Sequence, residues 1–293
     1  MSELTIAQEQ TDALVATVTE QITLDTFDPS DQDVLRQLVE GLGDTRGIVR
    51  LNVAETLGEI GEPAVPFLLD ALAGHENVVV RRAAAKTLTL IADPSTVSPL
   101  IYALTHDEDT VVKGSSVGAL ARIGEPAVQA LLDILSADES PESMKGHAAW
   151  ALAFIGVEAK ERMFREIQSE SASVRAAVIG VIAKVVQEEP DDQASGLLVQ
   201  SLADSDVNVR CEAAAALGNS VYRPAVPTLL ETLGHEDWQT RKAAALALMK
   251  IGDHAAIEPL QVALARESEE SIKPVIKLAI SQLERQSDED DWD

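Results

Sequence analysis

The sequence has few aromatic residues and a single cysteine. Aromatic side chains make up 3% of the 293 residues, whereas the hydrophobic fraction is 46%. A core built from Ala, Val and Leu suits closely packed helices better than a β-sandwich. The one cysteine, Cys211, excludes a disulfide within the chain and a multi-cysteine zinc site.

Basic residues are also scarce. The chain has 23 Lys and Arg against 49 Asp and Glu, which gives a formal net charge of −26. Nucleic acids and anionic membrane surfaces would be repelled by such a chain, because binding to either depends on cationic side chains. A basic or mixed-charge protein partner is compatible with this charge.

Long apolar runs are missing as well. No uninterrupted apolar segment reaches about 18 residues, so we expect no transmembrane helix. The first residues, MSELTIAQEQTDALVATVTEQ, carry neither a basic n-region nor an apolar h-region, which predicts that they are not a signal peptide. We therefore expect a cytoplasmic protein.

What the sequence does contain is an internal repeat. Segments such as IVRLNVAETLGEIG, VVRRAAAKTLTLIA and VVKGSSVGALARIG recur along the chain, each with a basic residue near its start. These basic residues lie 30 to 35 residues apart: Arg50, Arg81, Lys113, Lys145, Arg175, Arg210, Arg241 and Lys273. A fixed period of this length is typical of a solenoid.

Each repeat predicts two helices. A proline turn opens the first, as in GEPAVPFLLDALAG, and the second starts near the basic residue and ends at a glycine such as Gly61, Gly124, Gly156 or Gly252. No segment alternates with the period of a strand. We predict an all-α protein, an α-solenoid of about eight helix pairs with a period of about 32 residues, built as a capping helix over 1–28, a solenoid over 29–285 and an acidic disordered tail over 286–293.

The proline turn, the V-R opening and the A-A-x-A-L-G run resemble the short HEAT-like repeats of the phycobilisome lyase family. The resemblance covers residues 29–285. It implies a HEAT-like fold whose second helices line a concave surface. The family includes bilin lyase subunits, relatives linked to phycobilisome turnover and proteins without known chemistry, so the resemblance alone does not decide an activity.

Two repeated polar patterns have a catalytic and a structural interpretation. An acid precedes every basic residue by five or six positions, which favours a ladder between neighbouring repeats over a catalytic carboxylate pair, because a catalytic pair would occur once. His75, His106 and His235 recur in the turns between helices, too far apart for one zinc ion. We expect no metal site and interpret Cys211 as a small packed thiol.

One helix face stands out. His147, Trp150 and Phe154 are spaced by three and four residues in KGHAAWALAFIG, at positions where other repeats are mixed in polarity. In the two neighbouring repeats, the position equivalent to Trp150 holds glycine, and the position equivalent to Phe154 holds a cation. These residues are Gly118, Gly180, Arg122 and Lys184. These residues predict an aromatic shelf for a protein anchor or a bilin, whose propionates would pair with the cations. The alternative is packing, with Trp150 filling the room beside the glycines.

Three functions follow. The first is a non-catalytic scaffold that binds a protein in its concave groove and needs no cofactor; the resemblance implies a phycobiliprotein or the machinery that handles it. The second is a bilin lyase subunit, working with a second HEAT-like subunit, in which His147 would be the catalytic acid–base group. The third is assembly of another cofactor, such as an iron–sulfur cluster, with a contribution from Cys211.

Overall fold

The computed structural model describes residues 3–188 and 191–290, and every regular element in these ranges is an α-helix or a short 3₁₀ helix. The all-α prediction is therefore confirmed. After the first helix, α1 (Glu3–Thr23), the described helices α2 to α17 follow one another as eight pairs. None of the helices within the described ranges is both long enough and apolar enough to cross a bilayer.

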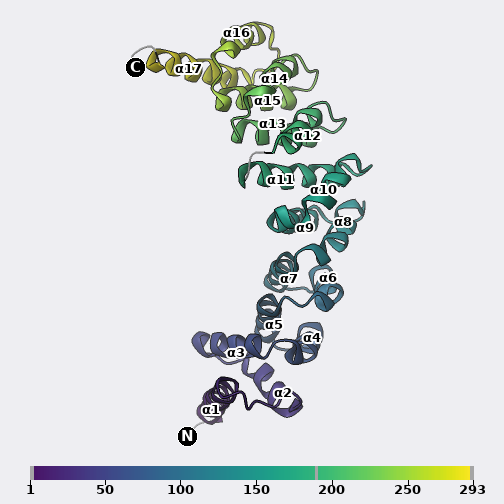
Figure 1. Cartoon of the computed structure of the whole chain (residues 1–293), viewed down its shortest axis with the longest axis vertical. Coiled ribbons are helices and arrows are strands. Elements are labelled where there is room, and N and C mark those ends of the chain that lie inside the picture. Colours follow the sequence, from purple (N-terminus) through teal and green to yellow (C-terminus); the bar gives the residue numbers. More distant parts are fainter. Residues whose placement is uncertain (1–2, 189–190, 291–293) are drawn as a thin grey trace. The chain divides into compact units, whose positions relative to one another are not determined.

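The chain divides into two compact units, Met1–Ala151 and Leu152–Asp293. In the first unit the helices alternate between two layers (Figure 1). The first helices of the pairs are α2 (Gln32–Gly41), α4 (Val65–Gly74), α6 (Val97–His106) and α8 (Val128–Ser136). The second helices are α3 (Gly47–Ile60), α5 (Val78–Ile91), α7 (Thr110–Ile123) and α9 (Glu142–Ile155), and α9 contains the division between the units.

The second unit repeats this pattern. Its first helices are α10 (Lys160–Arg165), α12 (Asp192–Ser201), α14 (Val226–Thr232) and α16 (Ile257–Arg266). Its second helices are α11 (Ala172–Glu188), α13 (Val207–Asn219), α15 (Trp238–Ile251) and α17 (Lys273–Asp290).

Small residues let successive second helices pack closely. A Cβ added at Gly218 of α13 would lie 2.9 Å from the Cα of Ala247 in α15, so the two backbones nearly touch. The first helices stand further apart and leave clefts of about 250 Å³ between α4 and α6 and about 690 Å³ between α14 and α16. The core lies between the two layers, and it includes the Leu or Ile that follows each of the eight basic residues by seven positions, from Leu57 to Ile280.

Glycines end four of the second helices, as predicted. Gly61, Gly124, Gly156 and Gly252 all have a positive φ, between 54° and 81°. Residues other than glycine rarely adopt a positive φ. The chain needs a positive φ here to turn from the second helix into the proline or polar turn that follows. Ala92 and Val221 occupy the corresponding position after α5 and α13 with φ values of 52° and 51°.

The first and last helices cover segments predicted to be a cap and part of a tail. Helix α1 packs against α2 and α3, and its role as a cap stays a prediction. Helix α17 continues into the segment predicted to be a disordered tail, as far as Asp290. Neither glycine nor proline follows Leu283 to stop the helix earlier. The acidic residues beyond that point, with Trp292, lie outside the described residues.

Two glycines of α7 give a matched test of this backbone analysis. We expect Gly124→Ala to lower the free energy of unfolding by about 1–3 kcal/mol, because Gly124 combines a φ of 81° with a ψ of −138°. Gly114→Ala should instead raise it by about 0.5–1 kcal/mol, since Gly114 is helical and a Cβ there meets no atom within 4 Å. Urea unfolding followed by circular dichroism measures both, and a loss in both variants would contradict the analysis.

Candidate functional site

The aromatic face predicted on α9 is a surface feature. Trp150 and Phe154 are 53% and 59% exposed, and His147 on the same face is exposed as well. The opposite side of the helix is buried and consists of Ala148, Ala151, Leu152 and Ile155. The packing of α9 into the core thus uses this buried face of the helix, and about half of each aromatic side chain faces outward.

The glycines predicted beside the tryptophan are open. A Cβ added at Gly118 of α7 or at Gly180 of α11 would meet no atom within 4 Å. No atom of Trp150 lies within 4 Å of that position at Gly118, and both the shelf and its packing alternative stay predictions.

The two cations of the predicted shelf are exposed on different units. Arg122 lies in the last turn of α7, in the first unit, and Lys184 lies on α11 in the second. Lys184 forms an ion pair with Glu188, at 3.3 Å, and its Cγ would lie 3.5 Å from a Cβ added at Gly156. The shelf as a single surface would combine residues of both units, so its assembly stays a prediction.

Three of the repeated basic residues pair with the acid of the next repeat, as the predicted structural ladder requires: Arg81, Arg175 and Arg241. Nε and Nη2 of Arg241 donate to the carboxylate of Glu267 in the next turn, at 2.8 and 2.6 Å, and Nη1 donates to the carbonyl of His235, at 2.9 Å. Arg175 makes the same set of bonds to Asp204 and to the Ser169 carbonyl. Each of these arginines thus ties the turn before its own helix to the turn of the following repeat.

The acid of the ladder also closes its own turn. Oε1 of Glu267 accepts from the backbone N–H of Glu269, at 2.8 Å. Where the corresponding position holds histidine, Nδ1 takes this role: Nδ1 of His235 accepts from the backbone N–H of Asp237 at 2.9 Å. His75 binds the N–H of Asn77 in the same way. These histidines are therefore turn-closing residues, and no group of His, Cys, Asp or Glu in the described part of the chain is arranged to hold a metal ion.

Hydrogen bonding keeps two carboxylates of the ladder, Glu267 and Asp204, charged. The bonds from Arg241 lower the pKa of Glu267 to about 2, against the opposing effect of burial. Burial also acts to raise the pKa of Asp204, but the bonds from Arg175 and from the Asp206 N–H leave it lowered. Carboxylates held in the ionised form cannot exchange protons near neutral pH, which argues against an acid–base role for this ladder.

Cys211 has the environment of a packed thiol. The side chain is partly buried, and burial is the main cause that raises its pKa. The neighbouring guanidinium of Arg210 is bonded to Thr240 Oγ1 at 2.9 Å and to the Asp204 carbonyl at 2.8 Å. With that cation engaged elsewhere, little favours a thiolate at Cys211, and the iron–sulfur hypothesis gains no support.

Comparisons with known proteins agree with the repeat analysis. A model of HEAT repeats matches residues 65–153 and 194–281, and a model of the PBS lyase HEAT-like repeat matches residues 49–74. The bilin biosynthesis protein MpeU of Synechococcus sp. (strain WH8020) is 38% identical over 280 residues, which cover 95% of this chain and 94% of that protein. The chain belongs to the phycobilisome lyase family of HEAT-like repeat proteins.

Similarity to solved structures concerns the fold of this family member. The structure of Kap121p bound to Nup53p matches 97% of the chain with a TM-score of 0.62 and 13% identity, and the match covers 36% of Kap121p. The structure of Kap95p with RanGDP matches 96% of the chain with a TM-score of 0.54 and 15% identity, covering 46% of Kap95p. Both confirm a helical solenoid.

The ladder predicts a pH-dependent loss of stability. Glu267→Gln should lower the free energy of unfolding at pH 7 by about 1.5–3 kcal/mol, because a charged, nearly buried hydrogen-bond partner of Arg241 is lost. The pKa of Glu267 is about 2 when folded and about 4.5 as a free side chain, so this contribution is complete above pH 4.5 and disappears as the pH falls toward 2.

The difference between wild type and variant should shrink over the same pH interval in urea titrations. Glu236→Gln is the matched control, since Glu236 is exposed and meets Arg241 only through its backbone carbonyl. Equal losses in the two variants would show that net charge, rather than the ladder bond, sets the stability.

Proposed function

We propose that the chain is a bilin-handling protein of the lyase type, which holds a bilin on the exposed face of α9 and presents it to a cysteine of a phycobiliprotein. The observation that carries the proposal is the pair of exposed aromatic rings, Trp150 and Phe154, in a chain that is 3% aromatic. The similarity to a bilin biosynthesis protein over nearly the whole length of both chains supports it. The proposal includes the predicted cytoplasmic location.

The chemistry of a bilin suits this face. A bilin is a flat conjugated molecule with two propionates, and aromatic rings offer it a stacking surface. Arg122 and Lys184 would pair with the propionates, as charge-assisted hydrogen bonds favour. At Gly118 of α7 and at Gly180 of α11 an added Cβ would meet no atom within 4 Å, so each of these two helix surfaces has open space for a ligand.

The transfer of the bilin to a cysteine requires few catalytic groups. The sulfur of the acceptor cysteine bonds to one carbon of an exocyclic double bond of the bilin, and the thiol proton passes to the conjugated system, so no group leaves. The orientation of the bilin relative to the thiol would supply most of the rate acceleration. His147 lies one turn before Trp150 and would relay the proton.

The second candidate is a scaffold that binds a phycobiliprotein, or a second HEAT-like subunit, without pigment. The observation in its favour is that the ladder carboxylates are held ionised by arginines and that the turn histidines close turns. Solenoids in general bind proteins through an extended face. In this case Trp150 and Phe154 would be the anchor residues of a protein interface.

Replacement of one ring tests the pigment site. We expect Trp150→Ala to weaken binding of free phycocyanobilin by about tenfold, because a stacking surface is lost. Tyr102→Ala is the matched control: Tyr102 is 58% exposed but lies on α6, in the other layer, and its loss should leave binding unchanged. Visible absorbance titrations measure both, and circular dichroism checks that the variants stay helical.

The outcome separates the candidates. Equal binding by wild type and both variants would place the pigment elsewhere and overturn the assignment of α9. If no form binds pigment, but wild type forms a complex with a phycobiliprotein that Trp150→Ala weakens, the scaffold is the function. Formation of a thioether on that phycobiliprotein would establish the lyase.

A further inference from the structure

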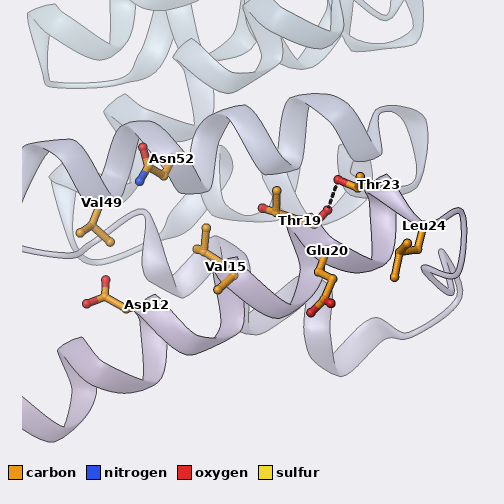
Figure 2. Close-up of a pocket in the computed structure, with 9 residues that line it drawn as sticks. Asp12, Val15, Thr19, Glu20, Thr23, Leu24, Val49 and Asn52 are labelled. Carbon is orange, nitrogen blue, oxygen red and sulfur yellow. Dashed lines mark hydrogen bonds between the residues drawn. The ribbon is translucent and has the colours of Figure 1, made fainter.

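A cleft of about 610 Å³ lies between α1 and α3, in the first unit and away from α9. Val15 and Ala16 of α1 and Val49 of α3 provide its apolar surface, and Leu24 stands at the end of α1 (Figure 2). The side chain of Leu24 is 63% exposed. Clefts of this volume accommodate several side chains of a partner.

Most polar groups of the cleft already have partners within the chain. The carboxylate of Asp12 accepts from both Nη atoms of Arg46, at 2.8 and 3.0 Å. The hydroxyl of Thr23 donates to the Thr19 carbonyl at 2.8 Å, which Figure 2 marks with a dashed line. Glu20 differs, because its exposed carboxylate forms no hydrogen bond or ion pair with any described residue. The carboxylate of Glu20 is therefore the charged group of the cleft lining that a partner would bind.

The negative charge extends along α3. Asn52 lines the cleft, and Glu55 and Glu59 follow it by three and seven residues, on the same face of the helix. Both carboxylates are exposed and, within the described ranges, neither is part of an ion pair. The apolar cleft thus has the exposed carboxylate of Glu20 in its lining, and two further exposed carboxylates, for which the described residues form no ion pair, follow along α3.

We propose that this cleft docks a basic amphipathic segment of a partner protein, with an apolar anchor beside Leu24 and Lys or Arg side chains against Glu20, Glu55 and Glu59. Charge complementarity selects this occupant. A second copy of the chain would bring a net charge of −26 to an acidic surface, and a nucleic acid would be repelled for the same reason. The proposal goes beyond pigment handling and does not depend on α9.

The test uses the full chain and a fluorescein-labelled helical peptide of Lys and Leu in an amphipathic pattern. Fluorescence anisotropy at physiological ionic strength should show binding that Glu20→Lys and Leu24→Asp each weaken by about tenfold. Glu9→Lys is the matched control, with the same change of charge on the exposed surface of α1 outside the cleft, and it should change the affinity by less than about twofold.

Three results would overturn the proposal. Equal weakening by Glu20→Lys and Glu9→Lys would show that only the net charge attracts the peptide. Equal binding of a matched Glu and Leu peptide would remove the charge argument. A dimer of the wild type that Leu24→Asp dissociates would make a second copy the occupant. Binding of phycocyanobilin by Glu20→Lys should equal that of wild type, so failure here is distinguishable from failure of the pigment site.

Discussion

The arginine that opens a second helix is the constraint on which the array depends. Its guanidinium binds the carbonyl of its own turn and the carboxylate of the next, as Arg241 does with His235 and Glu267. A planar group with several fixed donors can make both bonds at once, which a lysine ammonium cannot do with the same geometry. Arg81, Arg175 and Arg241 thereby tie the turns of successive repeats at three junctions, where the small residues of the second helices can pack at close range.

This arrangement separates stability from recognition. The ladder uses its carboxylates and arginines internally, and the core uses the buried stripes of the helices. Trp150 and Phe154 on the second helices, and Leu24 and Glu20 at the border of the first helix, are exposed and lie outside both the ladder and the buried stripes. We therefore expect substitutions at these positions to cost little of the free energy of unfolding.

Much of the fold could be predicted from the sequence because the same signals recur in every repeat. The glycine ends and the core position at Leu57 and its counterparts follow from periodicity and local backbone rules. The turn-closing role of His235 could not be predicted, because it depends on which nitrogen faces a backbone N–H. The cleft beside Leu24 was missed too, since its lining comes from the first helix of the chain and from the second helix of the first repeat, which are far apart in sequence. Trp150 was found because aromatic residues are rare in this chain.

The ladder has a consequence for how such proteins can evolve. At four junctions a guanidinium of one repeat binds an acceptor at the start of the next: Arg81 with Asp107, Arg175 with Asp204, Arg210 with Thr240 and Arg241 with Glu267. A gene duplication that copies one whole repeat therefore creates a new junction whose polar groups already match on both sides. Arrays of different length can arise in single steps, without an evolutionary intermediate that buries an unpaired charge. Each added repeat also brings a new outward face on which selection can act.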